Sequence, residues 1–394
     1  MLLVYSKNKF SLLYLFFIYF VLEVCIGGAG GIFKFGPLTL RKLNFILVLL
    51  VLLYVFFEKK RIQKDLFYFT IGQFLILGLA TFIGFFSYED HQKVFENLLM
   101  QSFFLILPLY GFFINNEKQV KTISNIIIWS AIIMAIGYLM LLLSIFVFNW
   151  ISFDEVWLLV SDSEEMMGRG DNAFFYKGFL YMCIGIYFLE SYHNTILKRL
   201  GQLVVLLAIY LTYTRGFFVA LFFTTVLYFL ILNKVWQSLL ILFISLTIML
   251  AFGKAYSETS FDRSESDMIR VTQLQQVKER ITPISTFIGH GFGEGVPIRD
   301  NHMEINYLEI FHKQGILGLL FWIFILFYVI ILYLRINKNS KVERIARPFV
   351  LGSIFVYFQS ATNPFLTNSI GMNMIMLSLV SLKVLGNIDT ENEG

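Results

Sequence analysis

Long apolar segments separated by short charged clusters run along nearly the whole chain. A helix needs about 20 mostly apolar residues to cross the hydrocarbon core of a bilayer. Charged residues make up only 15% of the 394 and hydrophobic residues 57%, whereas a soluble domain carries about 25% charged residues. The sequence therefore predicts an all-α integral membrane protein. Its twelve candidate transmembrane helices are residues 10–26, 43–57, 66–86, 94–114, 122–148, 173–190, 200–213, 216–232, 235–252, 304–334, 348–366 and 368–385.

The orientation follows from the basic residues, which collect in alternate loops. Cytoplasmic loops of membrane proteins are enriched in Lys and Arg. The intervening loops include SYEDHQK and the acidic FDEVWLLVSDSEEMMG, which are predicted to lie outside. This pattern places both termini in the cytoplasm. The residues that define the inner side are Lys59, Lys60, Arg61, Lys64, Lys118, Lys121, Lys198, Arg199, Lys234, Arg335, Lys338, Lys341, Arg344 and Arg347.

One long polar connection divides the chain into three parts. Residues 1–252 hold the first nine predicted helices, residues 253–303 form an outer loop, and residues 304–394 hold three helices and a short cytoplasmic tail. The loop contains a helical pattern, because Leu274, Val277 and Ile281 recur on one face. The opposite face carries Gln273, Gln276 and Arg280. We expect this amphipathic helix to lie along the membrane surface or to cap the bundle.

Two arginines on the outer side are candidates for binding phosphate. Arg270 falls on the apolar stripe of the loop helix, where a guanidinium needs an anionic partner. Arg215 lies in TYTRGFF at the junction of two apolar runs, and an ionisable residue at this depth is a functional candidate. Arginine suits phosphate because its planar fork donates two parallel hydrogen bonds. The simpler alternatives are pairing of Arg270 with a carboxylate such as Asp267, and interfacial anchoring by Arg215.

The segment RDNHMEINYLEIFHKQGILG, where the outer loop re-enters the membrane, carries a candidate base. Asn301 and Glu304 have the spacing of an N-cap and its capping-box partner, which puts His302 in the first helical turn. A neutral imidazole can accept a proton from a hydroxyl group, although a simple interfacial hydrogen bond is the alternative. A polar stripe on one helix face predicts a water-filled cavity lined by His302, Asn306, Glu309 and Lys313.

Other polar features have structural explanations. Lys177 follows the acidic outer loop and is a further candidate for binding an anion, with pairing to Asp171 as the alternative. Gln359 and Asn363 are explained by interhelical hydrogen bonds. The GGAGG stretch at residues 27–31 follows no strand, so it is not expected to cradle phosphate.

The sequence predicts neither a metal nor a cofactor. Cys25 and Cys183 are far apart, without a metal-ligand spacing. HExxH, GxSxG and Walker motifs are absent from the sequence. A net charge of +4 with the basic residues divided among loops excludes nucleic acid as a partner.

Three motifs in one order resemble the O-antigen ligase and polymerase family of bacterial inner-membrane glycosyltransferases. They are TRG at residues 214–216, the outer loop with Arg270 and GHGFG at residues 289–293, and the helix EINYLEIFHKQGILGLL. The resemblance covers about Leu200 to Phe324. It implies that an undecaprenyl-pyrophosphate-linked glycan is the donor, that Arg215 and Arg270 hold the pyrophosphate, and that His302 activates the acceptor.

The resemblance leaves two questions open. In many relatives the histidine stands where this sequence has Glu304, so the base is either His302 or Glu304. Within the family, a polymerase extends repeat units on their lipid carrier, and a ligase moves the glycan to lipid A core. We favour the polymerase, with membrane lipids around it and a chain-length regulator as a candidate partner. A flippase for lipid-linked sugars is the non-enzyme alternative, although the paired halves of many carriers are not evident here.

Overall fold

The computed structural model describes residues 2–32, 34–35, 38–59, 63–163, 165–168, 173–237, 239–240, 264–293, 295–338 and 340–393. Each predicted apolar run except 235–252, which lies largely outside these residues, contains a helix. The first half holds α1 (Leu2–Ile26), α2 (Leu40–Lys59), α3 (Lys64–Ser87), α4 (His91–Gln101), the 3-10 helix η1 (Ser102–Ile106), α5 (Leu107–Phe113), α6 (Glu117–Phe146), α7 (Phe153–Val160) and the 3-10 helix η2 (Ser161–Ser163).

The second half is also helical and contains a predicted outer-loop helix. Its helices are α8 (Phe179–Glu190), α9 (Thr195–Leu211), α10 (Arg215–Ile231), α12 (Ser264–Arg280), α13 (Pro283–Ile288), α14 (Asn306–Leu334), α15 (Lys341–Gln359) and α16 (Ser369–Glu393). The strands form two antiparallel pairs. One joins β1 (Lys34–Phe35) to β2 (Leu38–Thr39), and the other joins β3 (Met166–Gly168) to β4 (Phe174–Tyr176).

Six helices among the described residues are long and apolar enough to cross a membrane. They span Leu40–Phe57, Lys64–Ser87, His91–Phe113, Glu117–Phe146, Asn306–Leu334 and Ser369–Glu391. Their outward faces carry large exposed apolar side chains such as Phe74, Leu75 and Phe86, which would be costly in water. The chain is thus an all-α membrane protein, as the sequence predicts. The predicted helix at 173–190 is shorter than expected, because residues 174–176 form a strand and α8 begins at Phe179.

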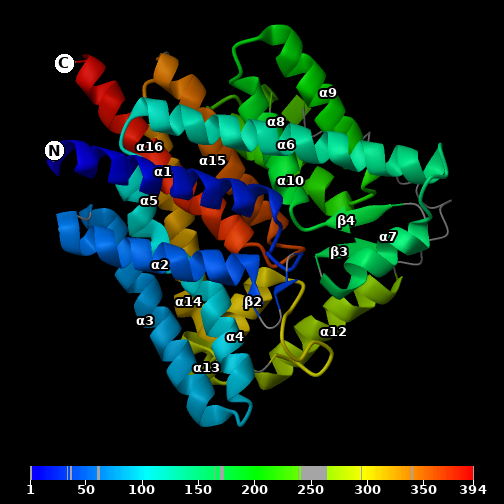
Figure 1. Ribbon diagram of the computed structural model, residues 1–394. Coiled ribbons are helices and arrows are strands. Elements are labelled where there is room, and N and C mark those ends of the chain that lie inside the picture. The colour runs from blue at the N-terminus through cyan, green and yellow to red at the C-terminus, as the bar shows by residue number, and fades with distance from the viewer. Residues whose placement is uncertain are drawn as a thin grey trace.

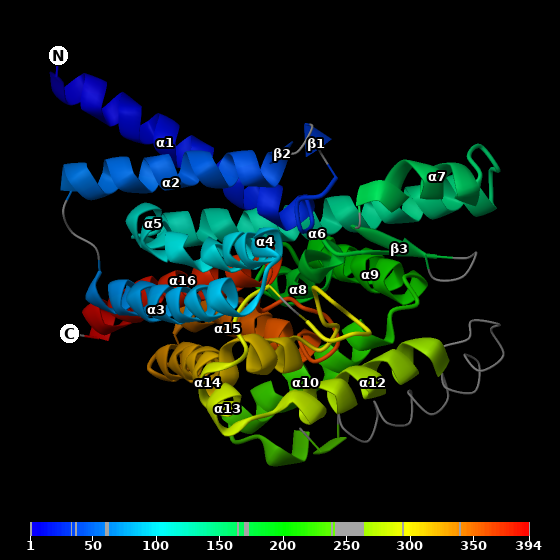
Figure 2. The same ribbon diagram turned by 90° about the horizontal axis from the view of Figure 1, so that it is seen from below.

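The ends of α1 and α16 that bear the chain termini lie on the same side of the bundle (Figures 1 and 2). α16 is the central helix and packs against α1, α14 and α15. Its Asn373 accepts a hydrogen bond from the Tyr110 hydroxyl at 2.5 Å and donates one to that of Tyr181 at 2.6 Å. These fully buried bonds join α5, α8 and α16, because polar groups in an apolar interior need partners.

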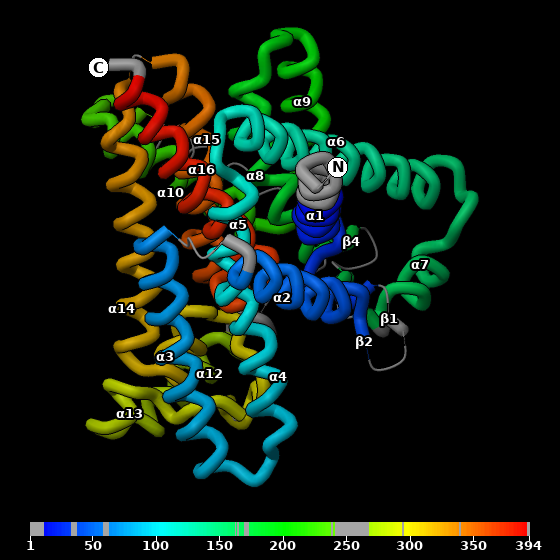
Figure 3. The backbone as a smooth tube through the Cα atoms, turned by 60° about the vertical axis from the view of Figure 1, so that its left-hand side comes forward, coloured from blue at the N-terminus to red at the C-terminus, as the bar shows by residue number. Residues whose placement is uncertain are grey.

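The GHGFG segment, residues 289–293, connects the outer loop to two membrane helices. α14 is kinked at Gly315, whose φ is +66°. The N–H groups of His290 and Gly291 donate to the carbonyls of His312 and Lys313, at 2.8 and 3.1 Å. These carbonyls are freed by the kink, so the segment supplies the partners that the helix no longer provides. The N–H of Phe292 donates to Ala80 of α3, which ties α3, α14 and the loop together beside α12 and α13 (Figure 3).

Replacing Gly315 with alanine should destabilise the fold. The positive φ disfavours any residue with a Cβ atom, and that atom would lie 2.4 Å from the backbone of Phe287. We expect Gly315→Ala to lower the free energy of unfolding by about 2 kcal/mol or more, measured by thermal unfolding of the detergent-solubilised protein. Gly78→Ala in α3 is the control, because its Cβ would meet nothing within 4 Å. Equal melting temperatures of the two variants would contradict this account of the kink.

Candidate functional site

His302 lies in a loop before α14 and not in its first turn. α14 begins at Asn306, with Ile305 at the N-cap position, so the predicted capping box is wrong. Asn301 instead accepts a hydrogen bond at 3.0 Å from the side chain of Asn97 in α4, and Glu304 pairs with arginines. The side chains of Asn301 and Glu304, which local spacing assigns to a helix cap, therefore bind residues from other parts of the chain instead.

The polar stripe of α14 is buried by its own partners. Asn306, Glu309 and Lys313 are almost fully buried, so the prediction that they line a water-filled cavity is wrong. Asn306 exchanges hydrogen bonds with Thr367, and its N–H donates to Ser360 at the end of α15. The stripe binds α14 to the neighbouring helices and, through Glu309, reaches His302.

His302 is held by a buried carboxylate. Its Nδ1 lies 3.2 Å from Oε1 of Glu309. The Lys313 ammonium donates to the same oxygen at 2.7 Å and to the carbonyl of Asn301 at 2.6 Å. The His302 side chain is 40% exposed, whereas Glu309 is fully buried. The imidazole is therefore anchored on its Nδ1 edge and accessible elsewhere.

Arg270 forms an ion pair with Glu304, and Arg299 shares it. The Arg270 Nε lies 3.0 Å from one Glu304 oxygen, and an Arg299 nitrogen lies 2.9 Å from the other. Pairing with a carboxylate was the simpler sequence interpretation, but the partner is Glu304; the side chain of Asp267 lies outside the described residues. Both arginines remain partly exposed. Arg299 was missed by the sequence analysis, because only the fold brings it beside Glu304.

The loop helix α12 turns to the protein a face that is only partly the one predicted. Gln273 and Arg280 of the predicted polar face bind residues 295–304. Val277 of the predicted apolar stripe is also buried, against Val296 and Met303, whereas Leu274 and Ile281 are exposed. Gln273 accepts from the N–H of Glu304, and Arg280 donates at 3.0 Å to the carbonyl of Gly295. Its place opposite the apolar stripe had suggested that Arg280 would be solvated, but it binds the loop backbone instead. The outcome follows from the need of the loop backbone for partners, which apolar side chains cannot supply.

α4 fixes the outer edge of the same loop. The ammonium of Lys93 lies 3.2 Å from the Asp300 carboxylate, and it holds the pKa of that carboxyl below its usual value through a hydrogen bond and its charge. Both groups are exposed, so the pair contributes little stability. The ion pair nevertheless restricts the position of Asp300, two residues before His302.

Arg215 is exposed at the first turn of α10. The next residue, Gly216, packs closely against Gln359 and Thr362, since a Cβ there would lie 3.2 and 3.0 Å from their side chains. Ser360 beside them accepts the N–H of Asn306. The end of α15 therefore links the helix start that bears Arg215 to the start of α14.

Lys177 belongs to a second polar cluster, made of Glu23, Arg41, Glu165 and the glycine loop at residues 27–31. The N–H groups of Ala29 and Gly31 donate to the Glu165 carboxylate at 2.8 and 2.7 Å. Burial raises the pKa of Glu165, while the charge of Lys177 acts against that shift. The glycine loop thus binds a carboxylate of the same chain. Lys177 lies near enough to Glu165 for its charge to act on this acid; Asp171, the partner expected from the sequence, lies outside the described residues.

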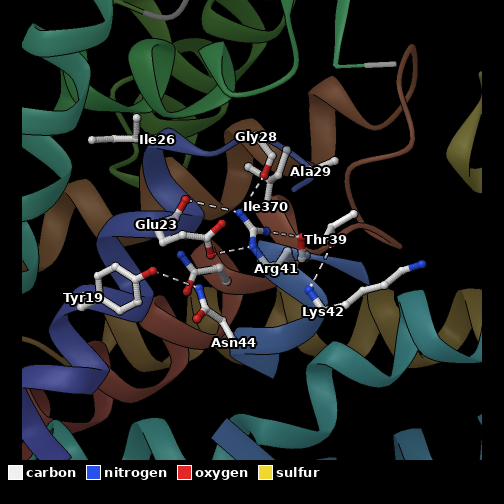
Figure 4. Close-up of polar contacts among 12 residues, drawn as sticks. Tyr19, Glu23, Ile26, Gly28, Ala29, Thr39, Arg41, Lys42, Asn44 and Ile370 are labelled. Carbon is white, nitrogen blue, oxygen red and sulfur yellow. Dashed lines mark hydrogen bonds and ion pairs between the residues drawn. The ribbon is translucent and has the colours of Figure 1, made fainter. Parts of the chain in front are cut away.

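Arg41 joins the loops and helices of this second cluster (Figure 4). Its guanidinium lies 2.7 Å from the Glu23 carboxylate, donates at 2.9 Å to the carbonyl of Gly28, and bonds Ser369 at the start of α16 at 2.5 Å. The sequence analysis missed this arrangement. An acidic residue inside the first apolar run was the available signal, because such residues need a charged partner.

Removing Arg41 should weaken the whole outer end of the bundle. It is 5% exposed, and its loss would leave Glu23 as a buried charge without its guanidinium partner. Breaking a buried ion pair in this way costs about 3 to 5 kcal/mol. We expect Arg41→Met to lower the melting temperature strongly in detergent, whereas Lys42→Met, at the exposed neighbouring position, should leave it unchanged. An unaltered melting temperature for Arg41→Met would show that this cluster does not stabilise the fold.

Comparison with known families and proteins supports the sequence interpretation. No family model matches the chain. The chain is 26% identical over 399 residues to a curated protein named O-antigen polymerase from Shigella flexneri, and the match covers 96% of this chain and 97% of that protein. The similarity therefore extends well beyond the three motifs, through the membrane helices on both sides of the loop. The predicted resemblance is confirmed: the chain is similar to an O-antigen polymerase along nearly its whole length.

Proposed function

We propose that the protein is a polysaccharide polymerase that joins undecaprenyl-pyrophosphate-linked repeat units at the periplasmic face of the bacterial inner membrane. The observation that carries this proposal is the end-to-end similarity to the Shigella flexneri protein named O-antigen polymerase. The reaction is a glycosyl transfer, which requires groups that offset charge on pyrophosphate and a base for the acceptor hydroxyl. The outer loop and the start of α14 carry both kinds of group.

The proposed membrane arrangement has twelve spans, cytoplasmic termini and a periplasmic loop at residues 253–303. The positions of basic residues in the bundle support this arrangement. The ion pairs between Arg347 and Glu343 and between Lys383 and Asp65 lie at the ends of helices remote from His302, where the sequence places the cytoplasm. The candidate site lies at the opposite ends of these helices.

Arg215, Arg270 and Arg299 are the proposed pyrophosphate ligands. Glu304 offsets the charge of Arg270 and Arg299, and a pyrophosphate with its higher charge would compete for these guanidinium groups. As the leaving group departs, they would neutralise its developing charge. Lys177 is a weaker candidate, because its charge acts on Glu165.

His302 is the proposed base, and Glu304 is not. Both oxygens of Glu304 already accept from arginines, so neither is placed to accept the hydrogen of a sugar hydroxyl. In the proposed step, His302 takes the proton of the acceptor hydroxyl as that oxygen forms a bond to the anomeric carbon. The bond from this carbon to the pyrophosphate breaks, and undecaprenyl pyrophosphate leaves with the electron pair. None of the residues in this step requires a metal.

A gel of surface glycan tests the function and the site together. Cells lacking the protein should show a single repeat unit on lipid A core, and wild-type protein should restore a ladder. His302→Ala should reduce the polymerisation rate by about 10² to 10⁴-fold. Arg270→Ala or Arg215→Ala should reduce it by about 10² to 10³-fold. The measurement is the length distribution of the glycan at equal protein level in the membrane.

His193→Ala and Lys278→Ala are the matched controls, because both residues are exposed and lie away from the proposed site. Both variants should give wild-type ladders. Long chains that accumulate on the lipid carrier in deletion cells would indicate a ligase instead. A deletion strain without even a single repeat unit on its core would favour a flippase. Wild-type ladders from the His302 and arginine variants would refute the site.

A single displacement should invert the anomeric configuration. The new linkage is expected to have the configuration opposite to that of the sugar on its lipid carrier, because the hydroxyl attacks from the face opposite the pyrophosphate. Nuclear magnetic resonance of the lipid-linked repeat unit and of the polymer would compare the two. Retention of configuration would exclude a direct displacement.

A further inference from the structure

Glu309 is the most deeply buried carboxylate next to the proposed site. Its Oε1 accepts from Lys313 and contacts Nδ1 of His302, while its Oε2 has no hydrogen-bond partner among the described residues. Burying a carboxylate and an ammonium costs several kcal/mol per ion. Two apolar side chains of similar volume often stabilise a helix contact equally well. If Glu309 and Lys313 served only to hold helices together, Glu309 would have no need to contact His302 as well.

The geometry of this contact fixes how His302 can act. A carboxylate at Nδ1 accepts the N–H of the neutral ring, so the proton stays on Nδ1 and the lone pair stays on Nε2. The same negative charge stabilises the imidazolium that forms when Nε2 takes a proton. Lys313 opposes part of this charge and also binds the carbonyl of Asn301, immediately before His302. The buried pair therefore holds the ring and the backbone beside it.

We propose that Glu309 is a positioning residue that orients the imidazole of His302 through its Nδ1, with Lys313 fixing the carboxylate. This inference rests on the proposed function, in which His302 is the base. Other charged groups on the elements around the loop are already paired. Arg270 of α12 and Arg299 share Glu304, and Lys93 of α4 pairs with Asp300. Among the ion pairs of the described residues, Glu309 is the acid that contacts His302.

The decisive variant replaces both members of the buried pair, Glu309→Met with Lys313→Met. Loss of one member alone could prevent folding, because it leaves the other charge buried and uncompensated. The double variant removes both charges and keeps the volume. We expect it to fold, by melting temperature and by its amount in the membrane, and to lose at least about 10²-fold in polymerisation rate. A folded double variant with wild-type ladders would overturn the proposal.

A split between kcat and KM gives a second measurement that a structural role would not affect. The double variant leaves the arginines that would bind the pyrophosphate unchanged, so we expect it to lower kcat with little change in KM for the lipid-linked donor. The assay uses isolated membranes supplied with lipid-linked repeat units from the deletion strain. A raised KM with an unchanged kcat would refute the positioning role.

Glu343→Gln is the matched control, since Glu343 pairs with Arg347 in a partly buried contact at the other end of the bundle. It should lower stability without lowering kcat. His302→Ala separates this inference from the proposed function. If His302→Ala is inactive while the Glu309 and Lys313 double variant is active, the positioning role fails and the polymerase proposal stands. If His302→Ala keeps wild-type activity, His302 is not the base and both fail.

Discussion

The contact between the GHGFG segment and the kink of α14 is the constraint on which the outer end of the structure depends. A helix that breaks inside an apolar bundle leaves carbonyls without partners, and the bilayer core cannot supply them. His290 and Gly291 supply them through their N–H groups. The segment must therefore stay against α14, and Phe292 ties it to α3 at the same point. The loop that follows, from Gly295 onward, thus begins from a fixed position.

That fixed position explains how a loop can hold a reactive side chain. Residues 295–304 are bound by the polar face of α12, by Asn97 and Lys93 of α4, and by Lys313 of α14. A histidine in an unrestrained loop would lose much of its catalytic value to disorder. Here three helices restrict the backbone around His302. Leu274 of α12 and the following Ile281 are exposed, which suits a helix at the edge of a bilayer.

The sequence predicted the class and most of the helices, because apolar length is a strong signal and lipid leaves helices few alternatives. It failed where distant residues override local preference. Glu304 has capping-box spacing but pairs with Arg270. Leu274 of the predicted apolar stripe is exposed although Val277 is buried, because the loop binds polar side chains of α12. Glu165 reaches the glycine loop across 134 residues of sequence, a distance over which spacing carries no information.

The pairing of Glu304 with two arginines separates the two candidates for the base. Both Glu304 oxygens already accept from guanidinium groups. His302 has instead a carboxylate behind its ring and partial exposure in front. Under the proposed mechanism the tasks are therefore divided, with Glu304 organising the arginines that would meet the pyrophosphate and His302 meeting the acceptor. His302 can take this role from a loop because α14 begins only at Asn306.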